Sequence, residues 1–300
     1  MRKRRTGRLK ESAIRAFFFT CGVLAVIVLI GIFATLITTS FPAFKEIKLS
    51  EFLLSKNWDP TSPEMEEYGI LSMIMSSFVV TLGALLIAVP IGVGVAAYLS
   101  DVAHWRVREI VKPVVEVLAG IPSVVVGFLG IVLFAPAISK LFNIGHGLTA
   151  LNGSVLLAIM ALPTIISISE DSLTAVPPAY GEASLALGAS RWQTLFRVKV
   201  PAALSGIIAA CMLGMGRAIG ETMTVLMATG NARTFPKLPQ ALLQSVRTMT
   251  ANIAIELGEV PYYTTHYYAL FAIGLVLFII TFAVNLIADV VLNKYQEREL

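Results

Sequence analysis

The sequence predicts an all-α, polytopic membrane protein with six transmembrane helices. Hydrophobic residues make up 56% of the 300-residue chain and charged residues only 14%. The mean hydropathy of +0.79 is far above that of a soluble globular domain. The formal charge of +4 comes from basic residues that flank apolar runs, as in membrane proteins, so we expect a lipid membrane and no nucleic acid as partner.

A basic N-terminus precedes the first apolar run. Six Arg and Lys residues lie within residues 1–10, and the run at 16–38 is long enough to cross the hydrocarbon core once. Because basic residues stay on the inner side of a membrane, this end is expected in the cytoplasm. The run has no small-residue cleavage site, which favours a retained helix over a signal peptide. The polar stretch 41–68 then lies outside.

The second and third runs each contain a helix-perturbing residue. Residues 70–99 include Pro90, where we expect a tilt or kink near the inner end. The third run, 111–141, contains Gly120 and Pro122. A proline inside the membrane frees a backbone carbonyl that neighbours or water must satisfy, so this break is expected beside a pathway or a moving interface.

Three further runs complete the six crossings. The fourth returns inward at 153–168, the fifth covers 202–227 and the sixth covers 268–292. The long segment 230–266 between the last two is expected outside and contains an amphipathic stretch at 240–257. Both chain ends are then cytoplasmic, and the chain is a multi-pass protein of the plasma (inner) membrane.

The distribution of basic residues tests this topology. The predicted inner side holds the N-terminal cluster together with Arg15, Arg106, Arg108, Lys112, Arg191, Arg197, Lys199, Lys294 and Arg298. The predicted outer side holds Lys45, Lys48, Lys56, Lys140, Arg233, Lys237 and Arg247. This asymmetry supports six crossings and places the segment between the fourth and fifth runs inside.

That inner segment is a polar, partly basic island with the sequence GEASLALGASRWQTLFRVKVP at 181–201. We interpret it as a helix on the membrane surface. Small residues at Ala183, Ser184 and Gly188 suit a short helix that inserts into a groove on another protein, where backbones approach closely. Glu182 lies near the helix start, where unsatisfied backbone N–H groups favour a carboxylate.

The island resembles the Glu-Ala-Ala loop of permease subunits of ATP-binding-cassette (ABC) importers. The loop pattern is Glu-Ala-Ala, three residues, Gly, nine residues and Ile-x-Leu-Pro, and the spacing is kept here up to Pro201. Ser184, Val198 and Val200 replace Ala, Ile and Leu. An ordinary amphipathic cytoplasmic loop is the alternative, which the closing proline at the matching distance disfavours. The resemblance implies the six-helix fold of type I ABC importer permeases.

Two charged residues, Arg217 and Glu221, interrupt the apolar fifth run. An Arg at the centre of a membrane helix costs roughly 2.5–3.5 kcal/mol, so such charges face a bundle interior or a wet cavity. At a spacing of four residues the two side chains share one helix face and can pair. They form either a structural ion pair or an anion path, in which Arg217 offers a planar charged fork to an oxyanion and Glu221 orients it.

Three segments are similar to the PstC family of phosphate importer permeases: AGIPSVVVGF at 119–128, GEASLALGASRWQT at 181–194 and GRAIGETM at 216–223. The likeness covers about 70–292. It implies that Arg217 and Glu221 act in the transport of inorganic phosphate. The segment after the Arg differs in the paired PstA subunits, so the PstC family is favoured. The residues expected to couple the chain to an ATPase are Glu182, Ala183, Ser184 and Gly188.

The resemblance also implies partners: a second, PstA-like permease, a dimer of PstB-like ATPases and an extracytoplasmic, PstS-like phosphate-binding protein. ATP and Mg would be bound by the ATPase, and no cofactor by this chain. The chain has no Gly-rich loop ending in Lys-Ser or Lys-Thr, so we expect a transport subunit and not an enzyme. The expected division is a helix-and-loop region at 1–69, a permease core at 70–293 with its coupling loop at 177–201, and a cytoplasmic tail at 294–300.

Two alternatives remain for the function. One is a permease for another oxyanion such as sulfate or molybdate, which would use the same coupling loop. The other is an ion-coupled carrier or a channel, in which Arg217 and Glu221 form a gate or proton site. A carrier would purify alone and work without ATP, whereas an importer subunit would recover a nucleotide-binding partner.

Other polar residues are weaker site candidates. We expect Glu116 in an interfacial pair near Lys112 and Arg108, and Glu170 with Asp171 on a solvated face. No carboxylate or Cys lies at ligand spacing from the histidines, so no metal site is expected; they are His104, His146 and His266. Cys21 and Cys211 both lie in apolar runs and are expected to be packing residues.

Overall fold

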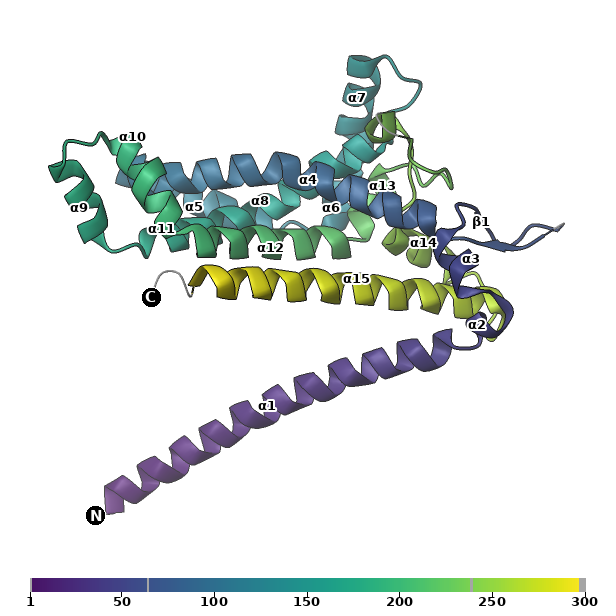
Figure 1. Cartoon of the computed structure of the whole chain (residues 1–300), viewed down its shortest axis with the longest axis horizontal. Coiled ribbons are helices and arrows are strands. Elements are labelled where there is room, and N and C mark those ends of the chain that lie inside the picture. The colour runs from purple at the N-terminus through teal and green to yellow at the C-terminus, as the bar shows by residue number, and fades with distance from the viewer. Residues whose placement is uncertain (1, 64, 238–239, 297–300) are drawn as a thin grey trace.

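The computed structural model describes residues 2–63, 65–237 and 240–296, and it is an elongated bundle of helices (Figure 1). The predicted all-α class is confirmed, and the additional two-stranded antiparallel hairpin pairs β1 (Trp58–Asp59) with β2 (Glu67–Tyr68). The expected tail at 294–300 lies largely outside the described residues.

The candidate membrane spans agree with the predicted number of crossings. Five spans are long and apolar enough to cross a membrane: Ile14–Glu46, Leu71–Val102, Ser123–Phe142, Ala150–Thr174 and Thr265–Val290. A sixth arises if Arg191–Ala202 and Leu204–Gly220, which meet at a 70° bend, are counted as one broken span.

The longest helices supply most of these spans: α1 (Arg2–Ser40), α4 (Leu71–Ala97), α8 (Ala150–Thr174), α12 (Leu204–Gly220) and α15 (Thr265–Gln296). Short elements connect them on both sides. At one end of the bundle these are α2 (Ala43–Glu46), α3 (Leu49–Leu54), the 3-10 turn η4 (Gln240–Leu243) and α14 (Met249–Glu256). At the opposite end they are the π-helical turns η1 (Tyr98–Val102) and η3 (Leu195–Lys199) with α9 (Pro178–Ala186), α10 (Arg191–Thr194) and α11 (Val200–Ala202).

The third predicted run is not one helix. It is divided into α5 (Trp105–Ala119), α6 (Ser123–Leu129), the π-helical turn η2 (Gly130–Phe134) and α7 (Ala135–Phe142). Pro122 adopts an extended backbone, with ψ 137°, and separates α5 from α6. The expected break is therefore confirmed. By contrast, α4 continues through Pro90 without ending.

The fifth predicted run is also divided. It was expected to be continuous over 202–227, but α12 ends at Gly220 and α13 covers Met223–Ala228. Glu221 lies between them with an extended backbone, φ −70° and ψ 126°. The short helices that follow the two breaks, α6 and α13, contact each other.

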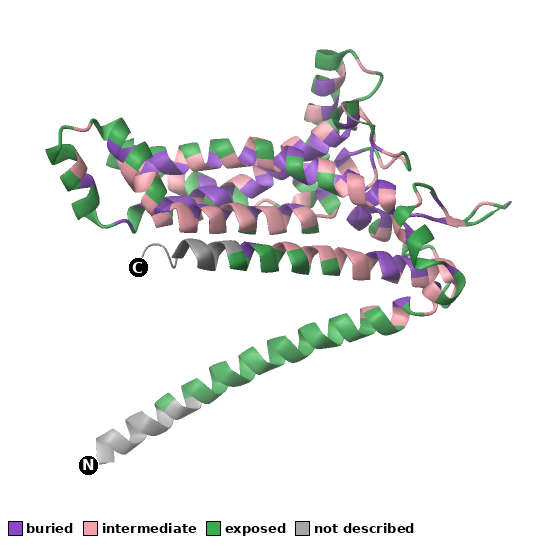
Figure 2. Cartoon of the chain, in the orientation of Figure 1, coloured by how far each residue is buried: buried purple, intermediate pink, exposed green. Residues whose placement is uncertain are grey.

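Helix α8 lies at the centre of the core and contacts α4, α5 and α12. Figure 2 shows the buried positions gathered on these central helices, whereas α1 is exposed along most of its length. Two glycines permit α4 and α12 to approach α8 closely. An added Cβ would lie 2.7 Å from Ile165 of α8 at Gly92 and 2.8 Å from it at Gly214. In a membrane, lipid or another subunit would cover the apolar side chains of α1.

The two ends of the bundle differ. Helices α9 and α10 lie at one end, where α1 begins and α15 ends (Figure 1). The hairpin, α2, α3 and α14 lie at the opposite end. This arrangement agrees with an even number of crossings between the two chain ends.

Candidate functional site

The site predicted in the fifth run lies at the junction of α12 and α13. Arg217 is in the last turn of α12, and Glu221 is the first residue after that helix. Both side chains are half-buried. The Glu221 carboxylate turns toward α13, where its Oε1 accepts a hydrogen bond of 3.4 Å from the backbone N–H of Thr224. The Thr250 hydroxyl donates a 3.1 Å hydrogen bond to the Glu221 carbonyl and fixes the backbone there.

The pairing expected from the four-residue spacing of Arg217 and Glu221 is not formed. No ion pair joins them among the residues that the structure describes. The Glu221 carboxylate instead accepts a hydrogen bond from the backbone N–H of Thr224 in α13, where the chain continues after the extended ψ of Glu221. Arg217 is therefore available to a ligand or a partner subunit without competition from Glu221.

Helix geometry places Arg217 at the edge of the open side of α12. Gly214 and Ala218 are buried toward α8, where Gly214 approaches Ile165. Leu213, one turn before Arg217, is 57% exposed. Residues four apart share a face, so Arg217 lies beside this exposed surface. A second subunit facing that surface would enclose the guanidinium.

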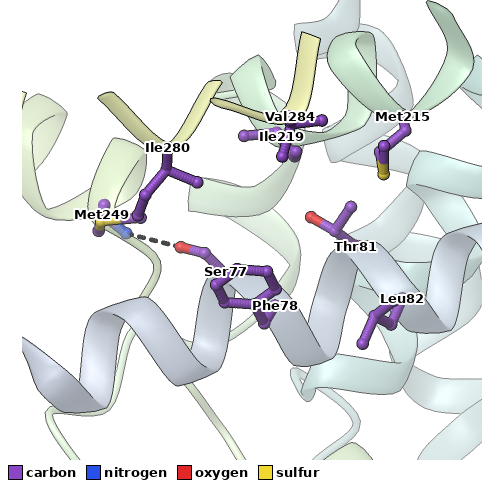
Figure 3. Close-up of a pocket in the computed structure, with 9 residues that line it drawn as sticks. All are labelled: Ser77, Phe78, Thr81, Leu82, Met215, Ile219, Met249, Ile280 and Val284. Atoms are coloured by element: carbon purple, nitrogen blue, oxygen red, sulfur yellow. Dashed lines mark hydrogen bonds between the residues drawn. The ribbon is translucent and has the colours of Figure 1, made fainter. Parts of the chain in front are cut away.

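A small apolar pocket lies on another side of α12, between α4, α12, α14 and α15 (Figure 3). Its volume is about 50 Å³, and Ser77 in its wall accepts a 3.2 Å hydrogen bond from the backbone N–H of Met249. Met215 and Ile219 line it, and each lies about 200° around the helix from Arg217. The pocket is therefore separate from Arg217. None of its lining residues carries a positive charge that could bind an anion.

Helix α13 is fixed to both α6 and α8. The Thr224 hydroxyl donates a 3.1 Å hydrogen bond to the Ser123 carbonyl at the start of α6. Asn152 of α8 is fully buried, and its Nδ2 donates hydrogen bonds of 3.1 Å to the carbonyls of Gly130 and Ala228. Asn152 thus bonds backbone groups of η2 and α13 at the same time. Sequence reasoning missed it, because a lone Asn in an apolar run does not reveal its partners.

The predicted coupling segment, residues 177–201, which is called the coupling segment below, folds as two helices and not as the single helix expected. Glu182, Ala183 and Ser184 lie in α9, which ends in a turn at Gly188. Gly188 has φ +84°, a left-handed conformation that favours glycine. The next helix begins at Ser190, which forms a capping box with Gln193. That Ser-x-x-Gln pattern is the sequence signal for the second helix.

The predicted coupling residues differ in exposure. Glu182, Ala183 and Gly188 are exposed, whereas Ser184 is half-buried and its hydroxyl lies 3.0 Å from that of Thr194. Large apolar side chains are exposed beside them: Tyr180, Leu185, Leu187, Trp192 and Phe196. Leu187 is 90% exposed. Because this end projects past the spans (Figure 1), such a surface is typical of a protein interface.

The charges predicted at the inner membrane surface pair differently from the prediction. Lys112 of α5 bonds Glu170 of α8 at 2.8 Å and lies 3.6 Å from Asp171. Glu170 is buried, so its expected place on a solvated face is wrong, whereas Asp171 is exposed. Glu116 is exposed, and no ion pair of it occurs in the described part of the chain. Packing of α5 on α8 brings Lys112 to Glu170 across 58 positions.

The end of the bundle that holds the hairpin and α14 contains a buried carboxylate that sequence reasoning missed. Glu256 accepts hydrogen bonds of 2.9 Å from Trp58 Nε1 and Arg247 Nη1, and His266 Nε2 lies 2.9 Å from it. Arg233 Nη2 is 3.3 Å away. Burial raises the pKa of Glu256, but the hydrogen bonds from His266 and Trp58, with the charges of His266 and Arg233, outweigh it and hold the pKa below its ordinary value.

His266 thus has a carboxylate partner that was not expected from its place in the sequence. The pair alone does not make a metal site, because such sites need three or more ligands. No group of three or more His, Cys, Asp or Glu side chains with suitable geometry occurs within residues 2–63, 65–237 and 240–296.

Known proteins resemble this chain over most of its length. Residues 88–297 match the family of binding-protein-dependent transport system inner membrane components. The probable ABC transporter permease protein YqgH of Bacillus subtilis is 40% identical over 232 residues, which cover 77% of this chain and 74% of that protein. The phosphate transport system permease protein PstC of Mesorhizobium japonicum is 32% identical over 311 residues, covering 97% and 92%.

The fold itself is found in a solved transporter. A bacterial ABC transporter involved in the import of the acidic polysaccharide alginate has a chain that superposes with a TM-score of 0.63. The superposition covers 96% of the present chain and 99% of that chain, at 17% sequence identity.

Proposed function

The chain belongs to the family of binding-protein-dependent transport system inner membrane components, and from that premise we propose that it forms half of a translocation path for inorganic phosphate. Membership makes it a permease subunit of an ABC importer in the inner membrane, a transport component and not a catalytic subunit. An importer of this kind works with a cytoplasmic ATPase and an extracytoplasmic binding protein.

The position of Arg217 carries the proposal. A guanidinium is always charged and presents a planar fork of donors to an oxyanion. Arg217 lies half-buried at the edge of the open side of α12, one turn after the exposed Leu213, and no ion pair joins it to Glu221 among the described residues. The two subunits would enclose phosphate between them, and Glu221 would act from the break that follows α12.

Relatives of nearly full length support phosphate as the substrate. Several of them are phosphate transport system permease proteins, with identities of 30–32%. The partners would accordingly be a PstA-like permease, a PstB-like ATPase dimer that binds ATP and Mg, and a PstS-like phosphate-binding protein. The core at 70–293 would form the path, and the region at 1–69 would add a peripheral helix.

The coupling segment would contact the ATPase through α9. Glu182, Ala183 and Gly188 would lie at the contact, and Ser184 would support it from within through Thr194. The exposed apolar side chains around them supply buried area for the interface. ATP binding would draw the ATPases together and move α9, so that the bundle alternates between inward- and outward-facing states.

The orientation follows from the same contact. If α9 and α10 meet a cytoplasmic ATPase, both chain ends are cytoplasmic, since α1 begins and α15 ends at that end of the bundle (Figure 1). The excess of basic residues at this end supports that orientation. The hairpin and α14 would then face the binding protein.

Uptake by the reconstituted complex tests the function. The chain is coexpressed with its second permease and ATPase, placed in vesicles with the binding protein, and labelled phosphate uptake is followed with and without ATP. We expect uptake that needs ATP and is not reduced by excess sulfate or molybdate. Uptake without ATP would indicate a carrier or channel, and strong competition by sulfate or molybdate would indicate another oxyanion; either result contradicts the proposal.

A further inference from the structure

The base of the coupling segment is anchored in the bundle. Leu195 of η3 is 1% exposed and belongs to a cluster of buried apolar residues. The cluster joins the inner ends of α4 and α8 to η3 and α12; its buried members are Ala96, Ala97, Leu173, Val176, Leu195, Ala203 and Ile207. Helix α9 projects beyond this cluster and contacts η3 and α10. Movement of α9 must therefore reach the bundle through η3 and its neighbours.

Lys199, the last residue of η3, joins α9 to the end of α4. A Cβ added at Gly181 of α9 would lie 3.2 Å from Cε of Lys199, so the backbone of α9 packs on the Lys199 stem. The Lys199 ammonium forms a hydrogen-bonded ion pair with Asp101 of η1. Both side chains are largely shielded, 23% and 20% exposed, which limits screening by solvent.

The turn η1 also receives a contact from α5. Arg108 donates from Nε a 2.9 Å hydrogen bond to the Leu99 carbonyl and from Nη2 a 2.7 Å hydrogen bond to the Ser100 carbonyl. These carbonyls belong to the π-helical turn in which Asp101 lies. Consequently η1 connects three elements: α4, which it continues, α5 through Arg108, and the coupling segment through Lys199.

We propose that the Asp101–Lys199 ion pair transmits movement of α9 to α4 and α5, which makes Asp101 and Lys199 positioning residues for transport. The inference rests on the proposed function, because the movement originates in the partner ATPase. A displaced α9 presses on the Lys199 stem, and the ion pair carries that displacement to η1. The alternative is that the ion pair only stabilises the fold locally.

The test compares Asp101→Asn, Lys199→Met and the charge-reversed pair Asp101→Lys with Lys199→Asp. Each is measured in the reconstituted complex for complex yield, thermal midpoint, ATP hydrolysis and the ratio of phosphate imported to ATP hydrolysed. We expect the single variants to assemble and hydrolyse ATP while the ratio falls about tenfold, and the reversed pair to regain most of it. Arg106→Met is the control, because Arg106 is an exposed cation of α5, outside the coupling segment.

A ratio equal to that of the parent in both single variants would overturn the inference. A lower ratio accompanied by equally large losses in complex yield and thermal midpoint would also overturn it. An ion pair that only stabilises the fold predicts that result. A second readout, stimulation of ATP hydrolysis by the binding protein, is independent of the substrate. If the parent shows stimulation but imports no phosphate, the proposed function fails while the ion pair remains testable through loss of stimulation in Asp101→Asn.

Discussion

The Thr224 hydroxyl of α13 donates a 3.1 Å hydrogen bond to the Ser123 carbonyl of α6. Each residue lies just after a break in a membrane segment, one at 120–122 and the other at 221–222. The bond therefore joins α6 and α13 at the positions where the chain leaves α5 and α12. Arg217 lies one turn before the second break and Glu221 lies in it, so the geometry of the proposed path depends on how α6 and α13 pack.

Gly127→Ala is expected to disturb that packing. An added Cβ would lie 2.9 Å from Met227 Sδ and 3.3 Å from the Thr224 Cα, which belongs to the backbone and cannot move aside cheaply. Overpacking of this kind costs about 1–3 kcal/mol, so the thermal midpoint of the purified complex should fall and uptake with it. Gly22→Ala in α1 is the control, since nothing lies within 4 Å of its added Cβ. Equal midpoints for the two variants would contradict the tight α6–α13 contact.

Glu256→Gln is expected to destabilise the end of the bundle that holds the hairpin and α14. The change leaves Arg247, whose side chain is 12% exposed, without its anion, and breaking a buried pair in this way costs about 3 kcal/mol. The destabilisation should appear at neutral pH as a lower midpoint of thermal unfolding. Glu51→Gln, which removes an exposed carboxylate of α3, should leave the midpoint unchanged. A midpoint for Glu256→Gln equal to that of the parent would show that the buried network contributes no stability.

The same carboxyl predicts an acid dependence of stability. Burial raises the pKa of Glu256, but the hydrogen bonds from His266 and Trp58 lower it by more, so the pKa in the folded protein is below its ordinary value. A lowered native pKa gives stability that is complete above the unfolded value of about 4.3 and is lost as the pH falls through the native pKa. The difference in midpoint between the parent and Glu256→Gln should therefore shrink on acidification below roughly pH 4.3. A difference that grows there would reverse the sign of the pKa shift.

Gly188→Ala is expected to strain the turn between α9 and α10. The space around Gly188 is open, but its φ of +84° is unfavourable for a residue with a Cβ, at a cost of about 1–2 kcal/mol. Amide hydrogen exchange across 184–194 should accelerate by about tenfold, the equivalent of 1.4 kcal/mol. Gly188→Asn provides the control, because Asn tolerates left-handed conformations. Unchanged exchange in Gly188→Ala would contradict a turn that requires glycine.

The sequence predicted the membrane class and the crossings because apolar periodicity and charge asymmetry are local signals. The break at Gly120–Pro122 was predictable for the same reason, since proline lacks a backbone donor and can break a helix locally, although α4 continues through Pro90. The break at Glu221 was not, because the run at 202–227 is apolar and lacks a proline inside it. The contacts that fix it come from other elements: Thr250 donates to the Glu221 carbonyl, and Thr224 to that of Ser123.

In the candidate sites, too, local patterns were predictable and contacts between distant elements were not. The spacing of Glu182 and Gly188 predicts a coupling segment, but the left-handed turn at Gly188 and the capping box at Ser190 divide this segment into two helices. The Glu256 network was missed entirely. Its carboxylate meets Trp58 across 198 positions, a contact that only the folded chain creates.

The central claim is that Arg217 presents its guanidinium to the transported anion. Uptake of labelled phosphate by the reconstituted complex should fall about hundredfold in Arg217→Gln, the equivalent of losing a charge-assisted interaction of about 2.7 kcal/mol. Arg217→Lys should recover only part of it, because an ammonium lacks the planar fork. Complex yield and basal ATP hydrolysis should persist, as in Arg106→Gln, which removes an exposed charge from α5. If Arg217→Gln imports phosphate at the parental rate, Arg217 does not act on the path and the account is wrong.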